Sequence, residues 1–303
     1  MSRVLVTGGN GFIGRHVLPL LAANGVEVHA VCQAHTPTTA DSRVRWHQAD
    51  IFDRQQVKAL VRHTQADQLI YLAWYTTPPR YWEASENTLW VEASVRLFQE
   101  FADAGGKRVL AIGTCAEYDW SGGYCIEDST PLAPLSLYGQ SKRALQAALA
   151  QIAASSGISA AWARLFFPYG PGEHPSKLVT HIATALLRGQ RASCSTPEQK
   201  RDFIYVTDVA SAIVAIFKSS FAGAINIGSG VPVTVREIAE KVANKIGRVD
   251  LLEFKAPDPS SKVSPLVVAD VGKLRELIHW TPVCSLDEGI AKTIEYCRRQ
   301  VNS

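Results

Sequence analysis

Short β-branched apolar runs alternate with amphipathic stretches of helical period over the first half of the chain. We expect strands at 3–7, 26–31, 68–73, 107–112 and 159–164, and helices at 14–24, 87–104 and 138–155. Strands that alternate with helices are typical of βαβ units, whose right-handed crossovers build a parallel sheet covered on both faces. The pattern therefore predicts an α/β fold with a doubly wound parallel sheet.

The pattern changes after Phe166, where proline and glycine cluster in residues 168–175. A short strand near 224–227 and helices at about 235–246 and 286–299 are expected beyond that cluster. We predict a first domain made of residues 1–165 with a returning segment near 201–228. Residues 166–200 and 229–303 would form a smaller C-terminal lobe over the carboxyl edge of the sheet, where ligands bind in such folds.

Composition excludes several classes of protein. The chain has 303 residues, 47% of them hydrophobic and 19% charged, which is typical of a globular protein rather than a disordered one. The net charge is 31 − 28 = +3, so we expect no nucleic-acid or membrane partner. The six cysteines form no C-x-x-C pair and the histidines lack metal-ligand spacing, so we expect no metal. Without a leader pattern, we expect a cytoplasmic protein.

A glycine-rich turn follows the first predicted strand and opens the first predicted helix. The segment Thr7-Gly-Gly-Asn-Gly-Phe-Ile-Gly14 has glycines at 8, 11 and 14. Such glycines allow a tight turn, close approach of a diphosphate, and packing of the helix on the strand, while the helix amino end attracts the phosphates. The segment predicts a dinucleotide-binding site in residues 1–165.

The end of the second strand bears on the choice of cofactor. Residues 31–35 contain no acid to bind the ribose hydroxyls of NAD, whereas His35 or Arg43 could reach a 2′-phosphate. NADP(H) is therefore favoured over NAD(H). Asp50 and Ile51 follow a third short strand and are expected at the adenine, although Asp50 could instead cap a turn or helix.

A tyrosine and a lysine are spaced for one helix face. Tyr138 and Lys142 are four residues apart, so the phenol and the ammonium group are expected to be neighbours. A nearby cation should lower the pKa of the tyrosine toward working pH, as proton transfer with a sugar hydroxyl requires. Thr114 ends a strand at the same edge, where its hydroxyl could hydrogen-bond a substrate oxygen.

These motifs occur in an order that resembles the extended short-chain dehydrogenase/reductase family, in its branch of nucleotide-sugar epimerases, dehydratases and reductases. The matching segments are TGGNGFIG at 7–14, AD at 49–50, LA at 72–73, GTCAEY at 113–118, YGQSK at 138–142, RLFFPYGPG at 164–172, RDFIYVTD at 201–208, INIGSG at 225–230 and HWTP at 279–282. The resemblance implies a Rossmann-type sheet and a homodimer that pairs the helices at 87–104 and 138–155.

The resemblance also implies roles for individual residues. Thr114, Tyr138 and Lys142 would form a catalytic triad, with Lys142 also holding the nicotinamide ribose. The expected cofactor-binding residues are Gly8, Gly11, Phe12, Ile13, Gly14, Asp50, Ile51, Leu72, Ala73 and Lys142. Arg201 matches an arginine that binds the substrate diphosphate, or else forms a surface salt bridge.

Two departures from the family pattern bear on the reaction. Sugar dehydratases place an Asp-Glu pair directly after the threonine, where this chain has Cys115 and Ala116. Glu117 comes one residue later and would point away from the site if the strand continued, although a local bend could bring it back. Phe167 replaces an asparagine that contacts substrate phosphate in many relatives.

Further substrate contacts are expected from two loops. The segment 74–82 is rich in aromatic residues, and Tyr75, with Tyr81 and Trp82, is expected to stack on a sugar face or to pack in the core. His174 and Lys177 are expected to meet substrate phosphates.

We expect an NAD(P)-dependent oxidoreductase that acts on a nucleotide-diphosphate sugar, most readily a C4-ketoreductase of an NDP-4-keto-6-deoxyhexose. An NDP-sugar 4-epimerase with tightly bound NAD is the alternative, followed by a non-catalytic nucleotide-binding protein.

Overall fold

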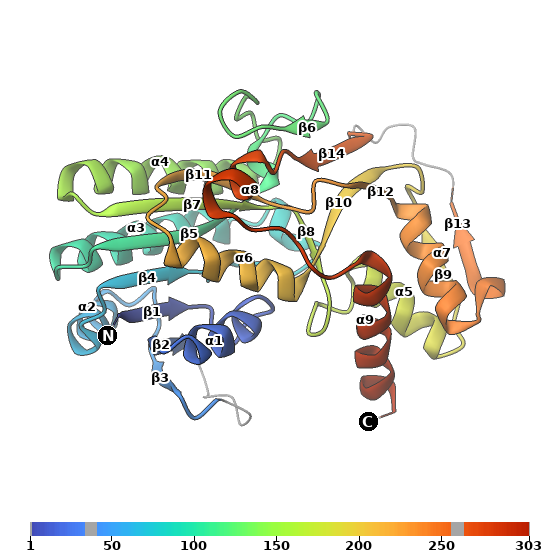
Figure 1. Ribbon diagram of the computed structural model, residues 1–303, viewed down its shortest axis with the longest axis horizontal. Coiled ribbons are helices and arrows are strands. Elements are labelled where there is room, and N and C mark those ends of the chain that lie inside the picture. Colours follow the sequence, from blue (N-terminus) through green and yellow to red (C-terminus); the bar gives the residue numbers. More distant parts are fainter. Residues whose placement is uncertain (1, 34–40, 256–263, 303) are drawn as a thin grey trace.

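A seven-stranded parallel sheet forms the centre of the molecule (Figure 1). The computed structural model describes residues 2–33, 41–255 and 264–302. From edge to edge, the strands are β11 (Gly223–Ile227), β7 (Ser159–Leu165), β5 (Arg108–Thr114), β4 (Gln68–Tyr71), β1 (Arg3–Thr7), β2 (Glu27–Cys32) and β3 (Val44–Gln48). From the junction between β1 and β4, the strands follow in sequence order toward both edges, which makes the sheet doubly wound. The predicted Rossmann-type α/β fold is therefore confirmed.

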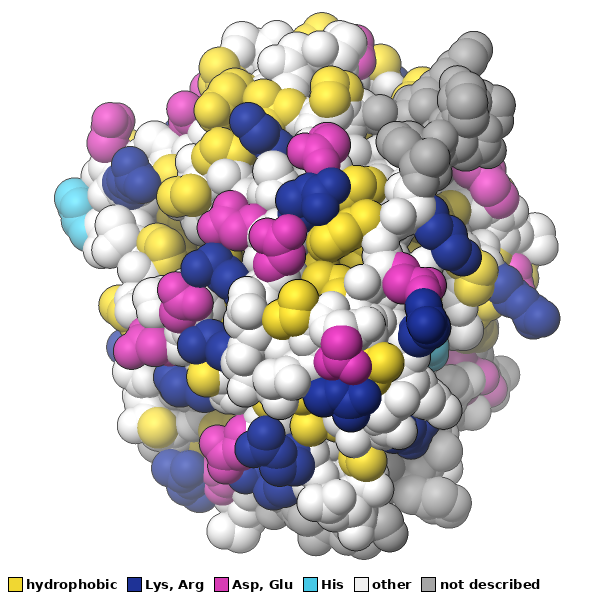
Figure 2. Space-filling model, turned by 90° about the vertical axis from the view of Figure 1, so that its right-hand side faces the viewer, with side chains coloured by type: hydrophobic (Ala, Val, Ile, Leu, Met, Phe, Trp, Pro, Cys, Tyr) yellow, Lys and Arg dark blue, Asp and Glu magenta, His cyan; other side chains and the backbone are white. Residues whose placement is uncertain are grey.

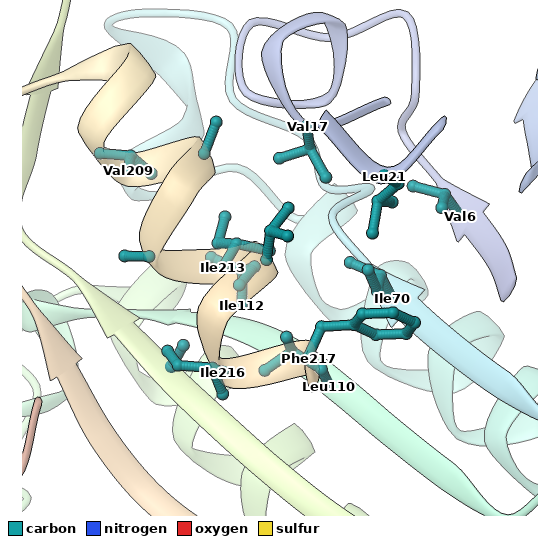
Figure 3. Packing of buried hydrophobic residues seen from close by; sticks show 14 of the residues in the cluster. Val6, Val17, Leu21, Ile70, Leu110, Ile112, Val209, Ile213, Ile216 and Phe217 are labelled. Atoms are coloured by element: carbon teal, nitrogen blue, oxygen red, sulfur yellow. The ribbon is translucent and has the colours of Figure 1, made fainter. Parts of the chain in front are cut away.

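Helices cover both faces of this sheet. One face carries α1 (Gly14–Ala23) and α6 (Val206–Lys218), and the other carries α2 (Arg54–Thr64), α3 (Glu86–Asp103) and α4 (Leu137–Ser156). Figure 3 shows Val17 and Leu21 of α1 and Ile213 of α6 meeting the side chains of the strands. All three side chains are fully buried, and burying each stabilises the fold by about 1.5–3 kcal/mol.

A second, smaller sheet lies beyond the carboxyl ends of these strands. Its strands run in the order β12 (Pro232–Thr234), β10 (Lys200–Tyr205), β14 (Leu266–Ala269) and β6 (Tyr124–Cys125), and β8 (Phe167–Tyr169) pairs with β10. A two-stranded sheet joins β9 (Ala192–Cys194) to β13 (Leu252–Phe254). The remaining helices are α5 (Leu178–Leu187), α7 (Val235–Ile246), α8 (Gly272–Ile278) and α9 (Leu286–Val301), with short 3-10 turns η1 (Arg80–Trp82), η2 (Cys115–Glu117) and η3 (Val249–Leu251).

The helices α5, α7 and α9 pack on one another around their own apolar core at one end of the molecule (Figure 1). On the outer surface of this end, basic and acidic side chains are interspersed (Figure 2). Arg236 and Lys241 of α7 pair there with Glu198 and Asp287 at 3.0 and 3.2 Å. The predicted boundaries between two lobes stay a prediction. None of the helices in the described ranges is long and apolar enough to cross a membrane.

A pair of hydrogen-bonded histidines joins β2 to β3 at the edge of the main sheet. Nε2 of His29 lies 3.2 Å from a carboxylate oxygen of Glu27, so this nitrogen carries the proton. Nδ1 of the neutral ring then accepts a hydrogen bond from Nε2 of His47, at 2.8 Å. Burial lowers the pKa of both histidines, and for His47 the neighbouring His29, His63 and Arg45 add to the effect.

We predict that this pair makes the fold less stable in mild acid. A histidine whose pKa is lowered by folding takes up its proton more readily in the unfolded chain, so stability is complete above the unfolded pKa of about 6.5 and is lost as the pH falls below it. The free energy of unfolding should be about 1 kcal/mol lower at about pH 5.5 than at about pH 7.5. Thermal melts followed by circular dichroism measure the difference.

The variant His47→Gln keeps a hydrogen-bond donor toward His29 but cannot take up a proton. Its stability should depend less on pH than that of the unmodified protein. His181→Gln, which changes an exposed histidine of α5, is the matched control and should leave the pH dependence intact. An equally steep loss of stability in His47→Gln would contradict this account.

Candidate active site

A cavity of about 600 Å³ lies at the carboxyl ends of β1, β4, β5 and β7 and extends toward β8, β10 and the start of α5. The expected cofactor and catalytic residues all line it: Gly8, Gly11, Phe12, Ile13, Gly14, Asp50, Ile51, Leu72, Ala73, Thr114, Tyr138 and Lys142. Parallel strands end at one edge of a sheet, which is why residues so distant in sequence meet there.

The turn after β1 has the geometry of a diphosphate cradle. Gly8 has a φ of +68°, and a Cβ at this position would lie 2.8 Å from the backbone nitrogen of Ala73. A Cβ on Gly14 would lie 2.3 Å from the carbonyl oxygen of Gly8. No side chain caps the amino end of α1, so the positive end of its dipole is available to an anion, while the amides of Arg15 and His16 donate to the carbonyls of Gly11 and Ile13. The residues present therefore fit the diphosphate of a dinucleotide.

The end of the cavity where the sequence predicts the adenine is formed by the loops after β2 and β3. Asp50 and Ile51 line it, and an Asp50 oxygen also accepts a hydrogen bond from the backbone of Phe52 at 3.0 Å. Arg43 is paired with Asp41 at 2.6 Å, and His35 lies outside the described residues. Among the described residues, those that line this end of the cavity include no cation. The structure therefore gives no support to the expected preference for NADP.

Thr114 and Tyr138 are placed by the ends of two regular elements. Thr114 is the last residue of β5, and its hydroxyl accepts a hydrogen bond from the amide of Ala116 at 3.2 Å. Tyr138 lies in the first turn of α4, which Ser136 caps by accepting a hydrogen bond from the amide of Gly139. The Thr114 side chain also acts on the Tyr138 phenol, whose pKa it lowers in part.

Lys142 reaches the same site from the next turn of α4. Its ammonium group donates a hydrogen bond to the carbonyl of Ile112 at 2.8 Å and lies 4.0 Å from the ring centre of Trp74. Only 4% of the residue is exposed. Burial lowers the pKa of Lys142 to about 7, against the opposing influence of the Glu117 carboxylate.

The pKa of Tyr138 differs from the expectation of a lowered value. Burial raises it, and the Thr114 side chain only partly opposes that effect. The cause is the surrounding wall, in which the rings of Tyr81, Trp82 and Trp74 have centres 5.0, 5.8 and 6.5 Å from that of Tyr138. Because loss of the phenolic proton would place a charge among these rings, Tyr138 holds its proton.

The residues after Thr114 turn away from the expected strand direction. Cys115 to Glu117 form the 3-10 turn η2, which brings the Glu117 carboxylate back to the amide of Thr114 at 2.8 Å. Glu117 is fully buried and does not line the cavity. Burial raises the pKa of the Cys115 thiol, which stays protonated. Among the residues that the structure describes, no carboxylate therefore lies in the cavity directly beside Thr114.

The expected substrate residues are placed differently from one another. His174 lines the cavity and its Nδ1 lies 2.9 Å from the Ser176 hydroxyl. Arg201 and Tyr75 do not line the cavity. Arg201 is 6% exposed, donates to Gln199 at 2.8 Å, and lies 5.6 Å from the ring centre of Phe167. It is therefore a buried residue behind the wall rather than part of a surface salt bridge.

Several lining residues were not anticipated from the sequence. They are Trp74, Trp120, Phe203 and Glu173. Trp74 takes the place in the wall expected for its neighbour Tyr75, a difference that the aromatic composition of the segment could not resolve. Glu173 accepts a hydrogen bond from Thr180 at 3.0 Å, and burial raises its pKa to about 8. Nothing in its sequence surroundings distinguishes it from an exposed loop acid.

Comparison with known proteins assigns the chain to a family. Residues 4–228 match the model of the NAD dependent epimerase/dehydratase family. The chain is 26% identical over 313 residues to UDP-glucuronic acid decarboxylase 1 of Xenopus tropicalis, covering 99% of this chain and 73% of the relative. It is 27% identical over 303 residues to dTDP-6-deoxy-L-talose 4-dehydrogenase (NAD(P)(+)) of Kitasatospora kifunensis, covering 95% of this chain and 93% of the relative.

A solved structure agrees with this assignment. MoeE5 in complex with UDP-glucuronic acid and NAD superposes with a TM-score of 0.88 at 28% sequence identity, covering 99% of this chain and 100% of MoeE5. The similarity extends over both the main sheet and the C-terminal helices, and the ligands named for MoeE5 are a dinucleotide and a nucleotide sugar. The chain belongs to the NAD-dependent epimerase/dehydratase family of nucleotide-sugar enzymes.

Proposed function

We propose that this protein is an NAD(H)-dependent oxidoreductase that acts at C4 of a nucleotide-activated 6-deoxyhexose, reducing the 4-keto sugar. The observation that carries the proposal is the convergence of Thr114, Tyr138 and Lys142 in one cavity with the glycine cradle. The cradle would hold the cofactor diphosphate, with Asp50 and Ile51 at the adenine and Leu72 and Ala73 along its length. When bound, the nicotinamide supplies the hydride.

The protonation state of Tyr138 suits reduction. A ketone that gains a hydride needs a proton donor at the developing alkoxide, and a phenol that holds its proton can supply one. In this proposal the Thr114 hydroxyl hydrogen-bonds the same sugar oxygen and orients it. Lys142 would hold the nicotinamide ribose and is the buried cation beside the reacting groups.

The residues around Thr114 argue against dehydration. Removal of water from a sugar needs an acid and a base beside the ring, whereas Cys115 and Ala116 stand at the positions after Thr114 and Glu117 faces the interior. Among the described residues that line the far end of the cavity, Glu173 carries a carboxyl group, which accepts a hydrogen bond from Thr180. Oxidation or reduction at C4 requires neither Glu117 nor Glu173 as an acid or base.

The far wall of the cavity supports a sugar with an apolar C5 substituent. Phe166, Phe167, Phe203 and Trp120 line it, and the rings of Phe167 and Phe203 lie 6.1 Å apart. A methyl group packs favourably against an aromatic wall, whereas a carboxylate would lose its hydration there without gaining hydrogen bonds. The 4-dehydrogenase relative, whose name specifies a dTDP-6-deoxyhexose, is consistent with this choice.

The cofactor is proposed to be NAD(H) rather than the NADP(H) favoured by the sequence. Arg43, which the sequence placed within reach of a 2′-phosphate, is already paired with Asp41. His174 and Lys177 line the end of the cavity beside Tyr81 and are proposed to contact the substrate, with Lys177 donating to the Tyr81 hydroxyl at 3.4 Å. Roles for Tyr75 and Arg201 in substrate binding, and a homodimer through α3 and α4, stay predictions.

The proposal is tested by following nicotinamide absorbance at 340 nm with NADH or NADPH and a panel of dTDP-, GDP-, CDP- and UDP-4-keto-6-deoxyhexoses. We expect stoichiometric loss of NADH with at least one member of the panel. No loss with any member, together with interconversion of C4-epimeric UDP-hexoses and co-purified NAD, would replace the reductase by a 4-epimerase. Absence of both activities and of dinucleotide binding would refute an enzymatic role.

We predict that Tyr138→Phe loses turnover but still binds NADH. The substitution removes the proton donor and leaves the glycine cradle untouched, so kcat should fall by about 10²–10⁴-fold while the Kd for NADH changes little. Stopped-flow absorbance gives kcat, and tryptophan fluorescence gives the Kd. Tyr124→Phe, at an exposed tyrosine of β6, is the control and should behave as the unmodified protein. Full turnover by Tyr138→Phe would remove Tyr138 from the mechanism.

A second prediction concerns the cradle. Gly8→Ala and Gly25→Ala place alanine at almost the same φ, +68° and +72°, so each should lose about 1–2 kcal/mol of stability. Only at Gly8 does the new Cβ meet backbone, that of Ala73, whereas none of the described atoms lies within 4 Å at Gly25. NADH affinity should fall at least about tenfold in Gly8→Ala alone, a loss worth about 1.4 kcal/mol. Equal affinities in the two variants would place the cofactor elsewhere.

A further inference from the structure

Behind the active site, Glu117 and Arg164 form an ion pair that no part of the proposed reaction uses. Glu117 on η2 is 0% exposed and Arg164 on β7 is 1% exposed, and their closest atoms, Oε2 and Nε, are 2.8 Å apart. Neither side chain lines the cavity. A buried ion pair contributes little net stability compared with apolar side chains of similar size. Its presence directly behind Thr114 therefore calls for a reason other than packing.

The pair is bonded to both elements that carry the active-site residues. On the strand side, Glu117 accepts hydrogen bonds from the amide of Thr114 at 2.8 Å and from the indole of Trp162 at 3.0 and 3.1 Å. On the helix side, Arg164 donates to the side-chain oxygen of Gln146 at 2.7 Å. Gln146 lies on α4, one turn beyond Lys142. The pair thus ties the end of β5 to α4.

The preceding residue leaves the space that the carboxylate needs. A Cβ on Gly113 would lie 2.4 Å from Oε1 of Glu117 and 2.1 Å from the indole nitrogen of Trp162. The turn is further held by a capping box. In it the Thr114 hydroxyl accepts a hydrogen bond from the backbone of η2, and the Glu117 carboxylate accepts one from the amide of Thr114. Gly113, Thr114 and Glu117 therefore form one local unit that turns the carboxylate under the strand end.

The carboxylate also acts on Lys142 through space. The carbonyl of Ile112 on β5 accepts a hydrogen bond from Lys142. Two residues later on the same strand, the amide of Thr114 donates a hydrogen bond to Glu117. Charges interact strongly where water is excluded. Burial and the Glu117 carboxylate have opposite effects on the pKa of Lys142, and the carboxylate favours the charged ammonium.

Other titratable groups surround the same site. Tyr138 lies on the helix that carries Lys142, Cys115 lies on η2, and Arg164 lies on β7. Burial keeps Tyr138 and Cys115 in their uncharged forms, and Arg164 is paired with Glu117. Burial raises the pKa of Glu117, and the ion pair with Arg164 and the hydrogen bonds from Thr114 and Trp162 oppose that effect by favouring the carboxylate, which is the negative group of this set.

We propose that Glu117 is a positioning residue of the active site, which holds Thr114 at the end of β5 and supplies the buried negative charge that favours the ammonium form of Lys142. This inference rests on the roles proposed above for Thr114 and Lys142. It explains why an acid is present near the threonine without facing the substrate.

The test measures the titration of Lys142 directly, without substrate or cofactor. Full-length protein containing lysine labelled with ¹³C at Cε is titrated by NMR, and the Lys142 signal is assigned by its absence in Lys142→Arg. The variants are Glu117→Gln, which keeps the shape of the side chain, and Glu117→Gln with Arg164→Gln, which removes both buried charges and so avoids an unpaired arginine. Asp208→Asn is the matched control, since Asp208 is a buried acid that accepts from the amides of Val283 and Cys284.

We expect the Lys142 midpoint to fall by about one pH unit or more in Glu117→Gln, which is a tenfold change in the ratio of charged to neutral lysine. The double variant should show a fall in the same direction. Asp208→Asn, which we expect to lower the melting temperature because it weakens two hydrogen bonds to backbone amides, should show none. An unchanged midpoint in the double variant, or an equal fall in Asp208→Asn, would reduce Glu117 to a structural role. Failure of the proposed function would appear separately, as absence of NADH binding and turnover in the unmodified protein.

Discussion

The parallel pairing of β1, β4 and β5 is the constraint on which the rest of the site depends. These strands end at Thr7, Tyr71 and Thr114, so the glycine turn, the Leu72–Ala73 segment and the proposed catalytic threonine emerge side by side. The turn lies so close to the end of β4 that a Cβ on Gly8 would meet the backbone of Ala73. A one-residue change of register would exchange the faces of every side chain and disperse the site.

Exclusion of water is the second feature that shapes the chemistry. Burial acts in opposite directions on the two groups of α4, because it raises the pKa of an acid and lowers that of a base. Tyr138 keeps its proton, whereas Lys142 is brought to about 7, close to working pH. Such a site needs an internal charge to hold the lysine in its cationic form, and the inward-facing Glu117 meets that need without offering a carboxylate to the substrate.

The C-terminal part of the chain supplies what the main sheet lacks. Its strands β8 and β10 carry Phe167 and Phe203, which close the cavity with an apolar wall, and the loop before α5 adds Glu173, His174 and Lys177. The same Rossmann-type sheet supports many reactions, so we expect the choice of substrate to depend on this wall rather than on the strands of the main sheet. The proposed preference for a 6-deoxy sugar follows from the rings that the second sheet brings to the cavity.

The sequence by itself determined the order of strands and helices and the glycine-rich turn, and it predicted the proposed catalytic trio, since each depends on local spacing or on short motifs such as Tyr138 and Lys142 four residues apart. It did not determine the pKa of Tyr138, because the rings of Tyr81 and Trp82 come from a distant loop. Nor could it place Trp74 rather than Tyr75 in the wall, or show that Glu117 turns inward to meet Arg164. Those outcomes depend on which distant side chains exclude water from a site, and only the tertiary structure decides that.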